Sequence, residues 1–376
     1  MYLICMSIKM DYDALCLSGG KLKGFAHLGA ITQFYPHIKN VKYLIGTSIG
    51  APICLLLMIG CHPLDIYLKI KDVDLSSVIN PLHILRTLGV CEKNLISNII
   101  KPIILSQLNI NHIPTLKELY NMTGKLLVMT TYDIDNHKLL YMSHLTYPNL
   151  NCLDAVEMSI NIPPLFGEVK INGSRVIDAG LINNCPYEYF NNGKKVLAIN
   201  LVSKKTNSNN IISYGLDILD STSFYIEKIE KNPKDMNISN VTIINVTVKD
   251  PGLINISNEK KMNLYTEGLL QSYEQYKKLK FIPQPQTKIS REYTQCLSNK
   301  LDAALESAEM KFLFYMFENH PELAKKRILT RGDSTVFVNN IVEIFKNNQN
   351  VQLKMSMDFL KKNNSLWSKF KEKWEF

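Results

Sequence analysis

Short apolar runs alternate with helix-like segments through the first 280 residues of the chain. Each run is short enough to be a buried strand, and several end in glycine or in polar residues. Parallel strands need crossover connections, usually helices, so this alternation predicts an α/β fold with a mostly parallel sheet covered on both faces. The expected strands are residues 14–18, 41–46, 126–132, 139–143, 168–170, 174–177, 196–202 and 241–248. The expected helices are residues 23–34, 49–59, 153–160 and 255–279.

The end of this pattern predicts a domain boundary. The chain has 376 residues and 46% of them are hydrophobic, which is enough for a large buried core. Beyond residue 281 the segment PQPQTK is typical of a linker, and the strand signal then fades into helical patterns. We expect a catalytic domain over residues 1–282 and a helical C-terminal extension over residues 283–376.

The net charge of +9 favours an anionic partner. Only five of the 43 basic residues are Arg, whereas proteins that read base sequence depend strongly on Arg. The charge alone suits either a membrane surface or a nucleic acid, and the shortage of Arg argues against a reader of base sequence.

The cysteine pattern and the N-terminal residues indicate the compartment. None of the eight Cys forms a CxxC pair or stands at a zinc-like spacing with His. The apolar start of the chain is short and is followed at once by charged residues, which argues against a secretory signal. Glycines and a proline interrupt the apolar stretch 44–61, which argues against a membrane-spanning helix. The expectation is an intracellular protein, cytoplasmic or peripheral at membranes, with no signal peptide, transmembrane helix, metal or cofactor. The abundance of Lys, Asn and Ile is typical of an AT-rich coding sequence.

The sharpest motif is Gly46-Thr47-Ser48-Ile49-Gly50, which fits G-x-S-x-G and falls between an expected strand and an expected helix. In this setting a sharp turn presents the serine side chain at the sheet edge. Gly46 and Gly50 remove side chains that would clash in the turn. The following helix N-terminus favours negative charge near Ser48.

A glycine-rich loop, Ser18-Gly19-Gly20-Lys21-Leu22-Lys23-Gly24, joins the first strand to the first helix. Such a loop can bind phosphate, although it lacks the GxGxxG and GK[ST] patterns. It can also be only a tight turn. Beside Ser48 a third interpretation fits better, in which the N–H groups of the loop form an oxyanion hole.

Asp178 ends another expected strand and is followed by Ala179-Gly180-Leu181-Ile182-Asn183-Asn184. An aspartate in this position can be a catalytic carboxylate. Taken alone, it is more often a structural turn residue.

Along the chain the glycine loop comes first, the serine motif second and the aspartate turn third, and together in this order they resemble the patatin-like phospholipases. The stretch 155–166 and the helix that contains Tyr265-Thr266-Glu267-Gly268 are also similar to segments of that family. The resemblance covers about residues 11 to 280. It implies a three-layer α/β/α fold and hydrolysis of phospholipid acyl esters in the manner of a phospholipase A, without calcium. The partner that it implies is a phospholipid membrane surface or a lipid substrate, and not a nucleic acid.

The resemblance also implies the site residues. Ser48 would attack the ester carbonyl, and Asp178 would accept its proton without a histidine. The N–H groups of Gly19, Gly20 and Lys21, together with that of Ile49, would hold the oxyanion. Lys23 matches a basic position of the family and would add positive potential near the substrate phosphate.

Two departures from the family keep an alternative open. The family loop usually has a third glycine where this chain has Lys21, and its acid motif usually has a glycine where this chain has Ala179. A lysine forced into positive φ would be strained. The alternative is a catalytically silent protein that binds lipid or a partner on the same fold. Nucleotide binding by the glycine loop is a third, weaker hypothesis.

Three further features have two interpretations each. His27 could approach the site, but a packing role is commoner. Residues 73–113 are rich in Leu and Ile and are either a helical cap or a lid that lines an acyl-chain channel. Residues 366–376 contain both Trp and form either an interfacial helix or a helix that packs on its own domain.

Overall fold

The computed structural model describes residues 11–73, 94–163, 165–190, 193–204, 221, 240–249 and 256–280. All of these residues belong to one compact unit, Lys9–Phe281. The predicted helical extension over residues 283–376 and its boundary with the catalytic domain lie outside the described residues and stay predictions. The same holds for the interfacial helix expected at residues 366–376.

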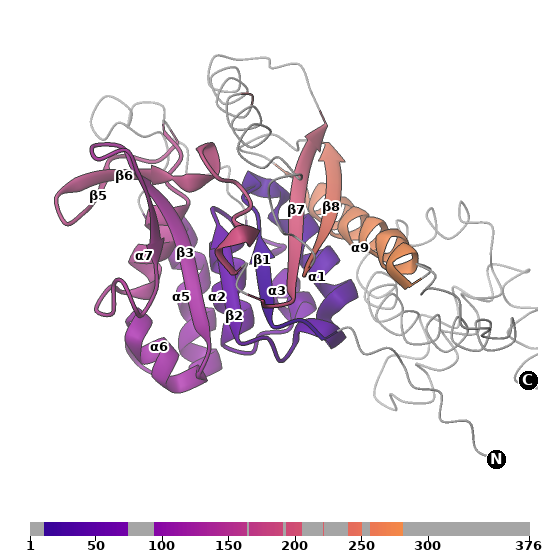
Figure 1. Ribbon diagram of the computed structural model, residues 1–376, viewed down its shortest axis with the longest axis horizontal. Coiled ribbons are helices and arrows are strands. Elements are labelled where there is room, and N and C mark those ends of the chain that lie inside the picture. Colours follow the sequence, from indigo (N-terminus) through magenta and orange to yellow (C-terminus); the bar gives the residue numbers. More distant parts are fainter. Residues whose placement is uncertain are drawn as a thin grey trace, which may run out of the picture. The chain divides into compact units, whose positions relative to one another are not determined.

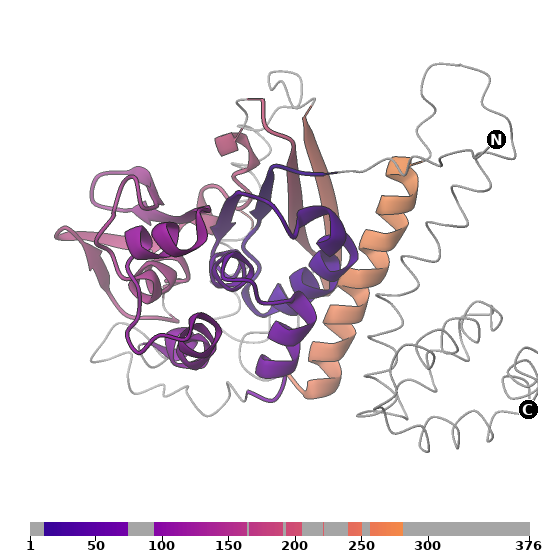
Figure 2. The same ribbon diagram turned by 90° about the horizontal axis from the view of Figure 1, so that it is seen from below.

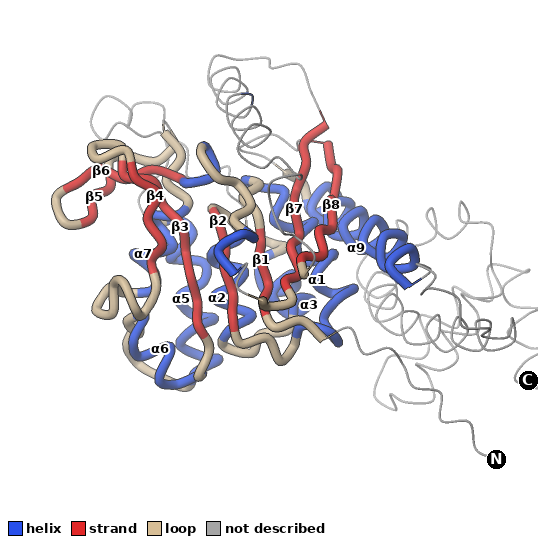
Figure 3. Tube along the Cα trace, in the orientation of Figure 1, coloured by secondary structure: helices blue, strands red, loops and turns tan. Residues whose placement is uncertain are grey.

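One mixed sheet forms the centre of this unit (Figures 1 and 3). Its strand order is β5-β6-β3-β2-β1-β7-β8, and β4 also pairs with β3. The strands are β1 (Ala14–Leu17), β2 (Tyr43–Thr47), β3 (Leu126–Asp133), β4 (Lys138–Met142), β5 (Val169–Ile171), β6 (Ser174–Asp178), β7 (Val196–Lys204) and β8 (Val241–Lys249).

The parallel part of the sheet is continuous. β3, β2, β1, β7 and β8 run in the same direction, whereas β4, β6 and β5 add antiparallel pairs at the β3 side. The predicted α/β class with a mostly parallel sheet is thus confirmed. The hairpin between β5 and β6 turns at Asn172 and Gly173, both at positive φ, as their sequence predicts.

The helices follow the strands in the expected alternation. They are α1 (Gly24–Ile38), α2 (Gly50–Met58), α3 (Pro63–Ile70), α5 (Leu95–Leu108), α6 (Leu116–Thr123), α7 (Cys152–Ser159) and α9 (Asn258–Lys280), with short 3-10 segments η1 (Lys21–Lys23), η4 (Ala179–Leu181) and η5 (Tyr187–Phe190). Among the residues in view, none of these helices is long and apolar enough to cross a membrane.

The sequence did not lead us to expect α3 or α6, although each begins at a signal that the sequence carries. Pro63 is the first residue of α3, and the side chain of His62 caps that end. Thr115 and Glu118 form a reciprocal capping box at the start of α6.

Each face of the sheet buries a different set of alternating side chains. On one face, Ala14 and Cys16 of β1 pack in a cluster with Cys185 and with Tyr187 and Phe190 of η5. Their neighbours in β1, such as Leu15, point to the opposite face, which α1 and α2 cover. The order of strands and helices therefore places the turn after β1 and the turn after β2 at the same edge of the sheet.

Two glycines let α1 and α9 cross at short range, and the two helices lie side by side in Figures 1 and 2. A Cβ on Gly29 would lie 1.8 Å from the backbone oxygen of Tyr265, and one on Gly268 would lie 2.0 Å from that of Ala26. Only glycine permits this approach, so the backbones of α1 and α9 pack directly against each other.

Candidate active site

The turn from β2 into α2 holds Ser48 in a strained backbone conformation. Ser48 has φ 53°, in the left-handed region that non-glycine residues rarely adopt. Its side chain is 4% exposed. A Cβ on Gly46 would lie 2.4 Å from the Gly50 oxygen, and one on Gly50 would lie 2.5 Å from the Leu17 oxygen. Both glycines of the motif are therefore required by close backbone approach.

A buried hydroxyl supports this turn. The backbone N–H of Ser48 donates to Oγ of Ser159 over 3.1 Å. Ser159 is the last residue of α7 and is fully buried. This role of Ser159 could not be predicted from sequence, because only the fold brings α7 to the β2 turn.

Strand pairing brings Asp178 next to this turn. Thr47, which precedes Ser48, pairs with Thr130 of β3, and Asp178 pairs with the next residue of β3, Thr131. The two site residues named from the sequence therefore come from strand ends that meet at neighbouring positions of β3. The Asp178 side chain is 2% exposed.

Backbone contacts fix the orientation of Asp178. Its N–H donates to the Asn161 carbonyl oxygen at 2.8 Å, and the Gly180 N–H donates to its Oδ1 at 2.7 Å. Ala179 opens the 3-10 turn η4, a backbone that any L-residue adopts. The alanine at this departure from the family motif therefore leaves the aspartate turn intact.

Asn184 lies between the glycine loop and the aspartate turn. Its Oδ1 would lie 2.5 Å from a Cβ on Gly19 and 3.1 Å from a Cβ on Gly180. The same Cβ on Gly19 would lie 3.1 Å from Cβ of Ser48. The amide of Asn184 thus fills the space between the two turns, a role that the sequence did not reveal.

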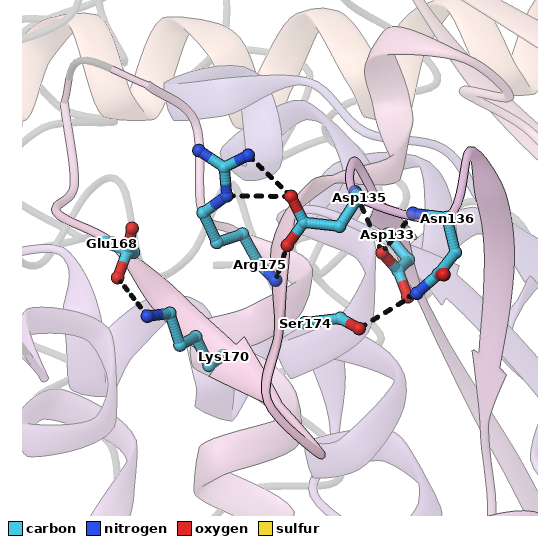
Figure 4. A network of polar contacts seen from close by, with 7 residues as sticks. All are labelled: Asp133, Asp135, Asn136, Glu168, Lys170, Ser174 and Arg175. Atoms are coloured by element: carbon cyan, nitrogen blue, oxygen red, sulfur yellow. Dashed lines mark hydrogen bonds and ion pairs between the residues drawn. The ribbon is translucent and has the colours of Figure 1, made fainter.

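A polar network joins the start of β6 to the end of β3 and the turn that follows it (Figure 4). The Arg175 guanidinium donates to Oδ1 of Asp135, and its backbone N–H donates to Oδ2 at 2.7 Å. Asn136 joins Asp133 to Ser174. A slip of one residue would turn Asp178 to the other face of the sheet, so this network helps to keep the carboxylate in place.

One of the three predicted oxyanion-hole donors of the glycine loop already has a partner within the protein. The Gly19 N–H donates to the Asn184 carbonyl oxygen at 3.0 Å. Oγ of Ser18 accepts the Leu201 N–H at 2.9 Å, which ties the loop to β7. The Gly19 N–H is thus committed within the protein, and Gly20 and Lys21 remain the loop donors to consider for an oxyanion.

The two lysines of the loop have different surroundings. Lys21 has φ 53°, so this lysine does occupy the left-handed region. Lys23 is 5% exposed, and its Nζ donates to Oγ of Ser203 in β7. Because the Lys23 ammonium is buried and bonded within the protein, it is poorly placed to bind a lipid phosphate.

His27 has a packing role, as the second of its two interpretations from sequence expected. Its ring is completely buried, and Nε2 lies 2.8 Å from the Ser18 carbonyl oxygen. Burial lowers the pKa of His27 to about 4, and the charge of Lys23 adds to this effect. The imidazole is therefore neutral at physiological pH and is bonded to the loop backbone.

An apolar pocket that is partly open to solvent, with a cavity volume of about 90 Å3, begins beside the turn that holds Ser48. Its walls come from η1, α1, α2, α3 and α5, and its side chains are apolar except for Lys21 and Lys261; they include Leu22, Phe25, Ile49, Pro52, Ile53, Ile66, Ile96 and Ile99. The described part of residues 73–113 thus lines this pocket through α5.

Comparison with known proteins gives consistent matches. Residues 15–191 match the family model of patatin-like phospholipases. The chain is 29% identical over 262 residues to a probable lipid hydrolase of Invertebrate iridescent virus 6, which covers 68% of this chain and 86% of that protein. It is 25% identical over 246 residues to an uncharacterized protein of Acanthamoeba polyphaga mimivirus, with 60% and 81% covered. A crystal structure of VipD from Legionella pneumophila aligns over 96% of this chain and 88% of that chain, with 16% identity and a TM-score of 0.48.

Proposed function

This chain belongs to the patatin-like phospholipase family, and on that premise we propose that it cleaves fatty-acyl esters of phospholipids with Ser48 as nucleophile and Asp178 as its base. It is a hydrolase of lipids. The observation that supports the finer proposal is the pairing of Thr47 and Asp178 with consecutive residues of β3. This pairing joins the strained serine turn to a buried carboxylate.

The first half of the reaction forms an acyl-serine. The Asp178 carboxylate accepts the proton of the Ser48 hydroxyl as its oxygen attacks the ester carbonyl carbon. The tetrahedral oxyanion accepts hydrogen bonds from the N–H groups of Gly20, Lys21 and Ile49. The C–O bond to the leaving alcohol breaks, and Asp178 returns the proton to that alcohol.

The second half regenerates the serine. Water attacks the acyl carbonyl while Asp178 accepts a proton from it, and the fatty acid leaves as Ser48 recovers its hydroxyl. Two features support a dyad without histidine. His27 is bonded to the loop backbone, and burial lowers the pKa of its ring to about 4, which makes it a weak base.

The apolar pocket supports a substrate with an apolar acyl group. Ile49, which directly follows the nucleophile, is one of its lining residues, so a chain that enters the pocket has its ester close to Ser48. Burial of methylene groups against Ile and Leu side chains favours binding by about 0.8 kcal/mol per methylene. The pocket equally fits a protein that binds lipid without cleaving it, and the experiment must separate the two.

The test is release of fatty acid from phospholipid vesicles by the wild type, Ser48→Ala, Asp178→Asn and, as a matched control, the exposed Asp154→Asn. We expect release from the wild type and Asp154→Asn only. Equal release by the wild type and Ser48→Ala would reject the mechanism. Binding of a fluorescent fatty acid by a wild type that releases nothing would identify a silent lipid-binding protein.

A further inference from the structure

Two cysteines from distant parts of the chain face each other in the core. Sγ of Cys16 and Sγ of Cys185 lie 3.7 Å apart, although the two residues are 169 positions apart in sequence. Both side chains are buried in the cluster that covers one face of the sheet. The S–S bond of a disulfide measures about 2.0 Å, so the two sulfurs have to approach by only about 1.7 Å to form one. Small rotations of the two side chains supply a movement of this size.

The pair lies at the junction of the two turns that make the candidate active site. Cys16 belongs to β1, two residues before Ser18, where the glycine loop begins. Cys185 directly follows Asn184, whose carbonyl oxygen accepts the Gly19 N–H and whose side chain fills the space between the loop and the aspartate turn. A bond between the two sulfurs therefore ties the strand that leads into the glycine loop to the segment that leaves the aspartate turn.

An oxidant can reach this pair from one side. Buried thiols inside regular structure are usually inert. Cys185, however, lies in the irregular segment between η4 and η5, next to Asn184, which is partly exposed. Such segments open locally at a lower free energy than the central strands of a sheet. A molecule as small as hydrogen peroxide thus reaches the Cys185 thiol without unfolding β1.

We propose that Cys16 and Cys185 are an oxidative modification site, at which hydrogen peroxide produces a disulfide. The Cys185 thiolate attacks one peroxide oxygen, the O–O bond breaks, and a sulfenic acid and water result once the thiol proton is counted. The Cys16 sulfur then attacks the sulfenic sulfur and displaces its oxygen as a second water. Two thiols are oxidised and one peroxide is reduced to two waters.

The bond stabilises the folded protein. It closes a loop of 169 residues in the unfolded chain and lowers the conformational entropy of that state. The folded chain changes little, because the two sulfurs are already neighbours. Oxidation should therefore oppose separation of the glycine loop from the aspartate turn. This inference does not depend on the proposed function, since it concerns the two thiols alone.

The experiment treats the folded full-length protein with hydrogen peroxide after removal of reductant. Remaining thiols are blocked with iodoacetamide, and disulfide-linked peptides are identified by mass spectrometry without reduction. Thermal unfolding is measured before oxidation, after it, and after addition of dithiothreitol. The variants are Cys16→Ala and Cys185→Ala, and the matched control is Cys152→Ala, which removes another buried thiol.

We expect a peptide that links Cys16 to Cys185 in the wild type and in Cys152→Ala, with a Tm raised by about 5–10 °C and restored by dithiothreitol. Neither Cys16→Ala nor Cys185→Ala should show that peptide or that shift. Links that involve only other cysteines, or a Cys16–Cys185 link that forms only in urea, would overturn the inference. A link without a rise in Tm would overturn its stabilising role. The wild-type peptide map decides the site even if one variant fails to fold.

Discussion

The backbone N–H of Ser48 donates to the hydroxyl of Ser159, a residue 111 positions away in sequence and fully buried. An N–H that loses its only buried acceptor raises the free energy of the folded state by about 1–3 kcal/mol. The strained turn that presents Ser48, the proposed nucleophile, therefore depends on a hydroxyl from another helix.

Replacement of Ser159 by Ala should lower both stability and activity. We expect a loss of about 1–3 kcal/mol in the free energy of unfolding, and a fall in kcat larger than any change in KM, because the Ser48 turn loses its support. Urea denaturation and ester hydrolysis measure the two effects. Ser272→Ala is the matched control, since Oγ of Ser272 is also buried but has no hydrogen-bond partner among the described residues. Equal effects of the two substitutions would refute the role of Ser159.

The strain at Ser48 can be measured by comparing two inactive variants. Ser48→Ala keeps a Cβ at φ 53°, whereas Ser48→Gly removes it. We expect the Gly variant to be the more stable of the two by about 1 kcal/mol, the reverse of the usual order for Ala and Gly. Thermal unfolding of both variants gives the difference. A more stable Ala variant would mean that the turn is not strained.

His27 should make stability depend on pH. Its pKa is about 4 in the folded state and about 6.5 when unfolded, so below pH 6.5 the unfolded chain binds a proton that the folded chain does not. The free energy of unfolding should fall as pH is lowered from about 6.5 to about 4, by up to roughly 3 kcal/mol from this group. Urea denaturation of the wild type and His27→Gln at pH 7 and pH 4.5 checks this. Identical losses in the two proteins would remove His27 as the cause.

The crossing of α1 and α9 predicts an unusual effect of Gly29→Ala. Helix propensity alone would stabilise the variant by about 1 kcal/mol. The added Cβ would instead lie 1.8 Å from the Tyr265 oxygen, so the helices must separate, and we expect a loss of about 3 kcal/mol or more. Gly124→Ala is the reference variant, because its added Cβ would meet nothing within 4 Å and only its φ of 64° opposes the substitution, so its loss should stay at about 1–2 kcal/mol. A stabilised Gly29→Ala would show that the crossing is looser than described.

Much of the fold and the core of the candidate site could be predicted from sequence because their signals are local. Gly46 and Gly50 show the sharp turn around Ser48, and Asn172-Gly173 shows the hairpin before Asp178. Alternating strand and helix patterns gave the parallel sheet. These features depend on residues that are neighbours in the chain.

Other parts of the site depend on residues that meet only in the folded protein. Nothing near Ser159 in sequence indicates that it accepts the Ser48 N–H. The partner of Lys23 lies 180 positions away in β7, so its burial could not be predicted. The engagement of the Gly19 N–H by Asn184 has the same origin.

The proton transfer from Ser48 to Asp178 is the central proposal, and reaction with a fluorophosphonate tests it most directly, because only an activated serine reacts. The measurement is the labelling rate of folded wild type, Asp178→Asn and Asp154→Asn, with the labelled residue located by peptide mass spectrometry. We expect the label on Ser48, wild-type rates for Asp154→Asn, and a rate at least about a hundredfold lower for Asp178→Asn, the usual loss when a general base is removed. Labelling of Ser48 in Asp178→Asn at the wild-type rate, or a label on another residue, would contradict it.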